Sequence, residues 1–299
     1  MVKFFIPNFY ENFKLHLFLI DYMRERPFYF RDNIEIGAVY GTFPGAIWNG
    51  GRPKPGNIPS EEDWDYFQEI IWEYNSRGIP IRFTWTNCLL KEEHFDDPMC
   101  NRIMQIAHNG RNEVLVSNPE LEKFLKQKYP YYKYIASITK CVQNEEEFLK
   151  MLNCDNYYMA VLDWRNNRNY EYLKSIPESL KHKIEFLVNS RCFGDCPNLK
   201  SHYAIMSKLQ LENRHIAPTD PYFGCKASWG NFYEMLKVKP LMISADEIYD
   251  LYNKELGFIN FKIEGRTFSP PEIIEEMVYY MVKPEYQNKI RLILLNYIW

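Results

Sequence analysis

Three cysteines fall within one stretch of the chain. Cys192 and Cys196 are separated by three residues in NSRCFGDCPNLKSHY, directly after an apolar run, and Cys225 follows in YFGCKASWG. Thiolates grouped in this way can converge on one metal centre, and soft sulfur ligands suit an iron–sulfur cluster or zinc. The spacing of the first pair is less usual for zinc, because zinc knuckles more often have two intervening residues. Buried structural thiols are the alternative interpretation.

A metal centre of this kind usually takes a fourth ligand. Cys88 and Cys141 each follow an apolar run, so both could face the same side of the fold. We favour Cys88 as the fourth ligand, although a ligand other than cysteine, or an open position, fits the pattern equally well. The two remaining cysteines lie in or at the ends of predicted helices and are expected to be structural.

One histidine lies close to the cysteine pair. His202 stands in KSHY, six residues after Cys196. Its imidazole could bind a substrate anion or donate a hydrogen bond to a cluster, and an ordinary helix histidine is the alternative. The chain has no HExxH, no GxSxG and no cysteine–histidine pair with protease spacing. The sequence therefore gives no support to an ordinary hydrolytic nucleophile.

Regular elements must position these residues, and eight short apolar runs supply candidates for strands. They are VKFFIPN (2–8), IEIGAVYG (34–41), PIRFTWTN (80–87), EVLVSN (113–118), YKYIASIT (132–139), YYMAVLDW (157–164), KIEFLVN (183–189) and FINFKIEG (258–265). Between them lie amphipathic stretches with capping residues at their starts, which predict helices over 59–78, 118–129, 144–152, 167–176 and 269–283. Eight alternating units favour an α/β fold of the closed TIM-type (β/α)8 barrel class. No GxGxxG follows the first strand and no GxxxxGK(S/T) occurs, so nucleotide-binding open sheets lose support.

We expect one barrel domain over residues 1–299. The longest gap, residues 190–257, lies between the seventh and eighth predicted strands. It carries the cysteine motif, and we expect it to form an insertion on the active face with at least two further helices.

Composition narrows the class of protein. The chain has 299 residues, of which 46% are hydrophobic and 25% charged, which is ordinary for a globular protein. The net charge of −3 argues against a strong electrostatic nucleic-acid binder, although a local basic patch is compatible with it. No apolar run approaches the roughly 18 residues of a membrane span, and the N-terminus lacks the features of a signal peptide. We therefore expect a cytoplasmic protein whose cysteines are thiols or ligands and not disulfides.

Residues at the carboxyl ends of barrel strands usually form the site. Polar or thiol residues end most of the predicted strands, namely Thr86, Asn87, Cys88, Ser117, Asn118, Thr139, Lys140, Cys141, Asp163, Trp164, Arg165, Asn189, Cys192, Lys262, Glu264 and Arg266. From the end of the seventh strand we take Asn189 as a substrate-binding candidate, together with His202 beyond it. The alternative is that loops are polar in general and that such residues cap the next helix.

The last predicted unit reads GFINFKIEGRTFSPPEIIEEMVYYMVKP over residues 257–284. It resembles the hallmark of the U32 peptidase family, in which a glycine precedes an apolar strand ending in KIEGR and a turn leads into a helix. The stretch IEFLVNSRCFGDCPNLKSHY, residues 184–203, is also similar to that family, where a strand containing a glutamate runs into the first of several cysteines. The resemblance is specific over 184–284 and only architectural over 1–183.

The resemblance implies a barrel that carries a four-iron, four-sulfur cluster, with Cys192, Cys196 and Cys225 among the ligands. Members of the family resemble oxygen-independent hydroxylases that use prephenate as the oxygen donor and act on ubiquinone precursors or on RNA. A collagenase-like protease activity has also been assigned to the family, and some members work as paired subunits. The cysteine spacing here departs from that of the commonest members, so the substrate does not carry over.

Glu264 and Arg266 also have a direct physical interpretation. They alternate around Gly265 after an apolar strand, so both side chains are expected to point into the barrel mouth. Together they could hold a carboxylated substrate through the guanidinium fork. The alternative is a structural ion pair that closes the barrel. Lys262 has the same parity but lies deeper, and we expect it to be structural.

Two hypotheses from different classes follow. The first is an iron–sulfur enzyme that performs oxygen-independent hydroxylation or related redox chemistry on a small aromatic or carboxylated molecule, or on RNA. The second is a peptidase-like hydrolase, or a non-catalytic binding subunit whose metal, zinc for example, is structural. A redox enzyme would be brown when it is purified without oxygen, whereas a zinc protein would be colourless.

Overall fold

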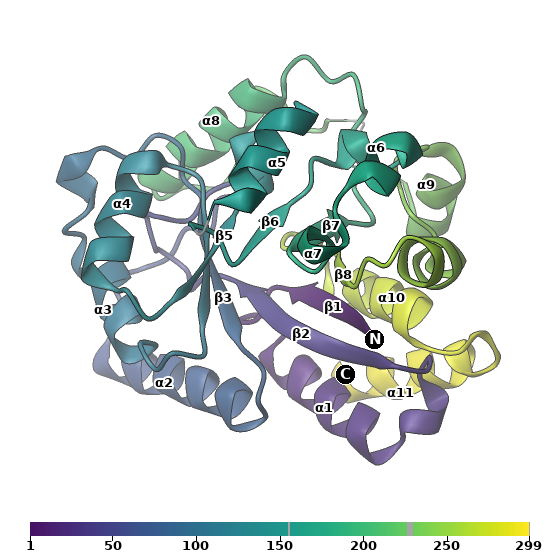
Figure 1. Ribbon diagram of the computed structural model, residues 1–299. Helices are drawn as coiled ribbons and strands as arrows, with labels where there is room; N and C mark the ends of the chain where they lie inside the picture. The colour runs from purple at the N-terminus through teal and green to yellow at the C-terminus, as the bar shows by residue number, and fades with distance from the viewer. Residues whose placement is uncertain (155, 226–229, 299) are drawn as a thin grey trace.

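The eight apolar runs form the eight strands of a closed parallel barrel. A computed structural model describes residues 1–154, 156–225 and 230–298. The strands are β1 (Val2–Pro7), β2 (Ile34–Gly41), β3 (Ile81–Trp85), β4 (Glu113–Val116), β5 (Lys133–Ala136), β6 (Met159–Val161), β7 (Ile184–Leu187) and β8 (Asn260–Lys262). Each pairs in parallel with its neighbours in the chain, and β8 pairs with β1 (Figure 1). The predicted barrel is confirmed, with strands two to five residues shorter than the apolar runs in most cases.

Helices follow the strands and surround the barrel (Figure 1). The α-helices are α1 (Phe13–Glu25), α2 (Glu61–Ser76), α3 (Pro98–Ile106), α4 (Pro119–Lys128), α5 (Glu145–Asn153), α6 (Tyr170–Ser175), α7 (Glu178–Lys181), α8 (Leu199–Leu211), α9 (Phe232–Val238), α10 (Pro270–Met281) and α11 (Gln287–Ile298). A π-helix, η6 (Glu247–Glu255), precedes β8, and short 3-10 turns are η1 (Pro27–Tyr29), η2 (Glu92–His94), η3 (Ile138–Lys140), η4 (Trp164–Asn166) and η7 (Pro284–Tyr286).

Side-chain caps fix the starts of the predicted helices. The Ser60 hydroxyl accepts a hydrogen bond from the backbone N–H of Asp63, and the Asp63 carboxylate accepts one from the backbone N–H of Ser60. The two bonds form a capping box at the start of α2. Asn118 and Asn144 cap α4 and α5 in the same way through their side-chain oxygens. All five helices expected from the sequence are present, with ends that differ from the predicted ones by up to three residues.

The interior of the barrel is partly charged. Apolar side chains fill one part of it, from Phe5, Ala38, Tyr40, Leu115, Ile135, Met159 and Val161. Beside them, Arg82 donates from Nε to Glu113 at 2.8 Å and pairs with Glu185 through its Nη1 atom. Its guanidinium also lies 4.1 Å from the centroid of the Phe5 ring. The four charged residues of this layer come from β3, β4, β7 and β8, with Lys262 as the fourth, so they join opposite walls of the barrel.

The segment between β7 and β8 covers part of the barrel at the carboxyl ends of the strands. It contains α8, α9 and η6, which agrees with the expected insertion with further helices. The Gln210 side chain of α8 bonds to the backbone of Ala46 and Lys54, in the loop after β2. The Ser207 carbonyl of α8 accepts from Asn87, just past the end of β3. Because these contacts lie beyond the carboxyl ends of the strands, α8 covers the face where barrel sites form. Within the described part of the chain, no helix is long and apolar enough to span a membrane.

Candidate functional site

A cavity of about 70 Å³ opens at the carboxyl ends of the strands. It is larger than one water molecule needs, so a small ligand fits it. Side chains from the ends of six strands and from α8 line it: Tyr40, Gly51, Arg52, Thr84, Thr86, Leu115, Ser137, Ile138, Thr139, Leu187, Tyr203, Lys262, Glu264, Gly265, Arg266 and Thr267. We call this space the mouth cavity.

Arg266 lies in the wall of the mouth cavity, as its strand parity predicts. Its Nη1 atom donates to the Asn49 side-chain oxygen at 2.9 Å and to the Thr84 hydroxyl at 3.0 Å, and Nη2 donates to the Gly50 carbonyl at 2.8 Å. A guanidinium has five N–H donors, so two remain after these bonds. Gly51 leaves room for the group, since a Cβ there would lie 2.9 Å from Nη2. Burial lowers the pKa of Arg266 to about 10, so the group is still a cation at neutral pH.

Glu264 also faces the mouth cavity, but its partner is a different arginine. Its Oε1 atom lies 2.9 Å from Nη2 of Arg52, and both side chains are about a quarter exposed. No ion pair joins Glu264 to Arg266, and no carboxylate of the described chain lies within 4.0 Å of the Arg266 guanidinium. The Glu264–Arg266 pair considered from the sequence is therefore corrected to a Glu264–Arg52 pair. Arg52 lies in the loop after β2, and the alternation of side chains along β8 could not identify it.

Asn189 anchors the end of β8 and does not line the mouth cavity. Its side-chain oxygen accepts from the Glu264 N–H at 2.6 Å, and its amide donates to the Glu264 carbonyl at 2.9 Å. The same amide bonds to the Glu276 carboxyl, which also accepts from Arg191 at 2.8 Å. Burial raises the pKa of Glu276 to about 8. These contacts give Asn189 a positioning role for Glu264 and Arg266, and its contact with a substrate stays a prediction.

His202 lies on α8 near the rim of the mouth cavity. Its ring stacks on Tyr222 at 5.4 Å between centroids. Burial and the nearby positive charge of Arg52 lower the pKa of His202 to about 4, so the imidazole is neutral at physiological pH. A neutral ring binds an anion weakly. The neighbouring Tyr203 is the α8 residue that reaches the cavity itself.

The predicted cluster ligands occupy two places. Cys192 lies near Cys196 and Cys225, close enough for a charge on either of those thiols to raise the pKa of Cys192. Burial, followed by the Glu264 charge, raises the pKa of Cys192 to about 12. Cys88 lies elsewhere: its Sγ atom is 3.4 Å from the Ser207 hydroxyl of α8, and its neighbouring thiol is Cys141.

These placements do not form a complete metal holder. Across residues 1–154, 156–225 and 230–298, no group of three or more histidine, cysteine, aspartate or glutamate side chains is arranged to hold a metal ion. As placed, the residues do not fit a four-cysteine cluster, and the iron–sulfur centre stays a prediction.

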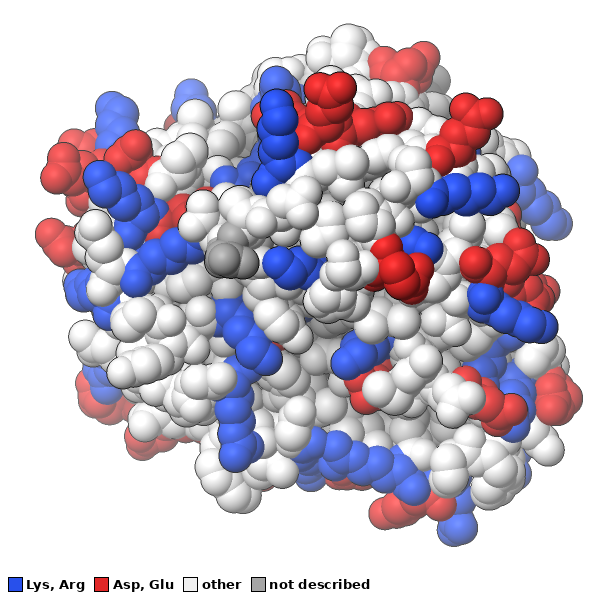
Figure 2. All heavy atoms as spheres, in the orientation of Figure 1, with Lys and Arg blue, Asp and Glu red and all other residues white. Residues whose placement is uncertain are grey.

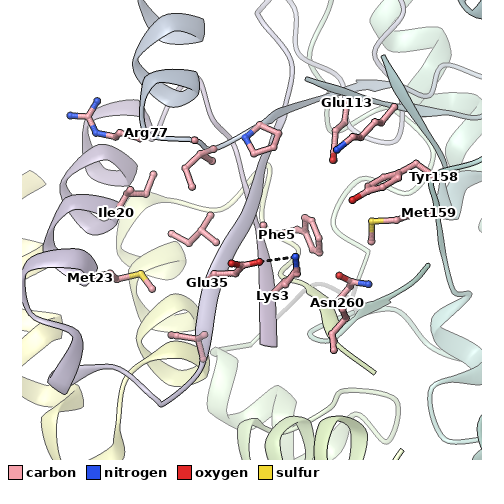
Figure 3. Close-up of a pocket in the computed structure, with 18 of the residues that line it drawn as sticks. Lys3, Phe5, Ile20, Met23, Glu35, Arg77, Glu113, Tyr158, Met159 and Asn260 are labelled. Atoms are coloured by element: carbon pink, nitrogen blue, oxygen red, sulfur yellow. Dashed lines mark ion pairs between the residues drawn. The ribbon is translucent and has the colours of Figure 1, made fainter. Parts of the chain in front are cut away.

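A larger cavity opens at the opposite, amino-terminal end of the barrel. Figure 3 shows Lys3, Glu35, Glu113 and Asn260 around it, with the Lys3–Glu35 ion pair drawn as a dashed line. Several of its charged groups have partners: Lys3 lies 2.8 Å from Glu35, Glu113 is bound to Arg82, and Arg77 pairs with Asp21. In barrels of this class the amino-terminal face serves stability, so we place the candidate site at the mouth cavity.

The outer surface carries both signs of charge. Over the face in Figure 2, lysine and arginine side chains are interspersed with aspartate and glutamate. Mixed charge of this kind is unlike the continuous basic surface of nucleic-acid binders. The concentrated positive charge of the site lies inside, at the mouth cavity.

The arrangement of strands and helices is found in a protein of known structure. The chain shares its fold with a U32 peptidase. The solved structure of the U32 peptidase Mk0906 matches with a TM-score of 0.53 and 14% sequence identity, over 89% of this chain and 93% of that chain. No family model and no curated protein sequence matches. The similarity predicted from KIEGR is thus confirmed at the level of the fold.

Several lining residues of the mouth cavity escaped the sequence analysis, among them Tyr40, Arg52 and Tyr203. Tyr40 is the last residue but one of β2, a strand whose end contributed no candidate, and its hydroxyl donates to the Ile263 carbonyl at 2.6 Å. Arg52 follows in the glycine-rich stretch NGGRPKPG, and a basic residue in such a loop after a strand was the available signal. Tyr203 stands beside His202 in KSHY and had no signal of its own.

Proposed function

We propose that this chain is a barrel enzyme that binds a small carboxylated substrate in the mouth cavity. The observation that carries the proposal is Arg266, a cation with two unused N–H donors and no carboxylate partner among the described residues. A guanidinium fork is the group best matched to a carboxylate. The size of the cavity favours a small molecule over RNA.

The balance of charge supports the same conclusion. The described lining holds three cationic side chains, Arg52, Lys262 and Arg266, and a single carboxylate, Glu264. Glu264 is already paired with Arg52. The surplus of positive charge in a partly buried space attracts an anion, because charges interact strongly where water is scarce.

Redox chemistry of the hydroxylase type is the finer part of the proposal. It rests on the three neighbouring thiols Cys192, Cys196 and Cys225 beside the mouth cavity. Since these residues are not arranged as a metal holder, we assign no step to a cluster. The hydrolase alternative has less support, because no histidine is among the described residues that line the cavity.

Carboxylate binding can be tested directly. Titration calorimetry with pyruvate and with benzoate, and with the neutral amide of each, should detect binding of the acids only. Replacing Arg266 with Gln should weaken that binding about ten- to hundredfold, as expected for the loss of a charged hydrogen bond. Arg266→Lys keeps the charge and should bind with intermediate affinity. Arg102→Gln, on the outer surface beside Glu61, is the matched control and should bind as the original chain does. Equal affinity for acids and amides would contradict the proposal.

The redox part has a separate test. The chain is purified without oxygen, and iron and sulfide are counted per chain. About four irons would support a four-iron cluster. Cys192→Ser should then lose the iron, while Cys154→Ser at the end of α5 should keep it. No iron and no sulfide in the original chain would remove the redox part and leave carboxylate binding untouched.

A further inference from the structure

Lys262 forms the floor of the mouth cavity. It is the last residue of β8, and its side chain is 8% exposed. Its Nζ atom lies 4.1 Å from the centroid of the Tyr40 ring. The expectation that this lysine is structural is therefore incomplete, because the side chain is buried in the interior and also lines the space where a ligand would bind.

A buried carboxylate stands behind the amine. Glu185 is fully buried, and its Oε1 atom lies 3.6 Å from Nζ of Lys262. That oxygen accepts no hydrogen bond from the described residues, whereas Oε2 is bound by Arg82. A separation of 3.6 Å is too long for a hydrogen bond and short enough for one to form after a small movement. Oε1 is thus placed to receive a proton from Lys262.

The surroundings favour an amine that is partly neutral. Burial lowers the pKa of Lys262 to about 8; the Glu185 charge opposes this shift, and the charges of Arg82 and Arg266 add to it. At pH 7 about a tenth of the molecules then carry the free amine, compared with less than a thousandth for an ordinary lysine. A lysine of this kind is a nucleophile toward carbonyl carbon.

We infer that Lys262 captures the carbonyl group of a small 2-oxo acid as an imine while Arg266 binds the acid's carboxylate. Lys262 passes its proton to Glu185, and the free Nζ attacks the carbonyl carbon. The carbon–oxygen bond then breaks, the oxygen leaves as water with the two protons that the free Nζ carried, and a carbon–nitrogen double bond remains. No oxidant or reductant is consumed. This inference rests on the proposed carboxylate site and specifies its substrate class.

The choice of a 2-oxo acid follows from the two side chains. Lys262 and Arg266 lie four residues apart at one strand end and line the same cavity of about 70 Å³. A carbonyl next to a carboxylate presents both reacting and binding groups within a small molecule. Arg266 would orient the acid, and Tyr40 would pack against the carbon that the amine attacks.

The experiment is reductive trapping with pyruvate. The full chain is incubated with pyruvate and sodium cyanoborohydride, which converts an imine into a stable secondary amine. Intact mass spectrometry should show one added pyruvate residue per chain, and peptide mapping should place it on Lys262. Lys262→Arg keeps the charge and should lose the adduct. Lys133→Arg, at the opposite end of the barrel, is the matched control and should retain it.

The outcomes separate this inference from the carboxylate site. The inference is overturned if the original chain forms no adduct, a result that does not depend on whether the variant folds. It is also overturned if the adduct is spread over several lysines and is unchanged in Lys262→Arg. If pyruvate still binds in calorimetry and needs Arg266, the proposed function stands without the imine. If the adduct forms on Lys262 but Arg266→Gln forms it equally well, the carboxylate role of Arg266 fails.

Discussion

At the scale of the residue, the site depends on how charges are compensated. Arg52 and Glu264 neutralise each other at 2.9 Å. Among the described residues, Arg266 is held by neutral oxygens only, and Lys262 faces its carboxylate at 3.6 Å. A cation held by neutral groups retains its attraction for an external anion, whereas a paired one has largely lost it. The functional roles therefore fall on Arg266 and Lys262.

The pH dependence of pyruvate trapping tests the state of Lys262. Burial lowers the pKa of its amine to about 8, and only the neutral form attacks. The trapping rate should rise about tenfold per pH unit below about pH 8 and level off above it. The groups that face Nζ are Glu185, Arg82, Arg266 and the Tyr40 ring. A rate that keeps rising to about pH 10, the range of an ordinary lysine, would contradict the shifted pKa.

The residues that the sequence identified are those with a local signal. Arg266 and Glu264 could be placed at the mouth because strand parity is a property of consecutive residues. The Arg52–Glu264 pair could not, because its members lie 212 positions apart and meet only once the barrel closes. The same limit applies to Cys88, whose position opposite Ser207 depends on how α8 crosses the rim.

At the scale of the element, the strands were predictable because parallel strands are buried on both faces and read as continuous apolar runs. Helices α2, α4, α5 and α6, which have side-chain caps, were predictable as well, whereas α3 was not predicted although Asp97 caps it. The first helix, α1, was missed, since its N-cap residue Asn12 makes no side-chain cap bond and its first turn contains no acid. The same two signals are absent at α8, where Asn198 makes no cap bond.

The end of β8 is positioned by Asn189, and removing that contact should be costly. Asn189→Ala deletes both bonds to the Glu264 backbone and one to Glu276 within a buried region. We expect a loss of about 3 kcal/mol in the free energy of unfolding, measured by urea denaturation. Pyruvate binding should also weaken, because Arg266 lies only two residues after Glu264 in the same loop.

Asn213 provides the control for this prediction. It makes the same pair of bonds with the Gly56 backbone, at 2.9 Å and 3.0 Å, but at an exposed position. Because its φ of 51° favours glycine, Asn213→Gly is the suitable substitution. It should change stability much less than Asn189→Ala. Equal effects would mean that burial does not set the cost.

At the scale of the whole molecule, the charged layer in the barrel interior joins strands from both halves of the chain. Arg82 of β3 pairs with Glu113 of β4 and with Glu185 of β7, and Lys262 of β8 approaches Glu185. Buried ion pairs add little stability compared with an apolar interior, but each partner becomes a liability once the other is removed. The layer also supplies Glu185, the carboxylate beside Lys262. This residue therefore belongs both to the buried ion-pair layer and to the proposed site.

Replacing Arg82 with Met should therefore destabilise the whole barrel. The substitution leaves Glu113 and Glu185 buried without their main counter-charge, which should cost about 3 to 5 kcal/mol in the free energy of unfolding. Lys208→Met, which removes an exposed partner of Glu212, should have little effect in the same denaturant titration. Changing both carboxylates to Gln in the Arg82→Met background should recover part of the loss, because Lys262 is then the one charge left among the four residues of the layer, and burial already lowers its pKa to about 8. If this triple variant is as unstable as Arg82→Met alone, packing and not charge is the cause of the loss.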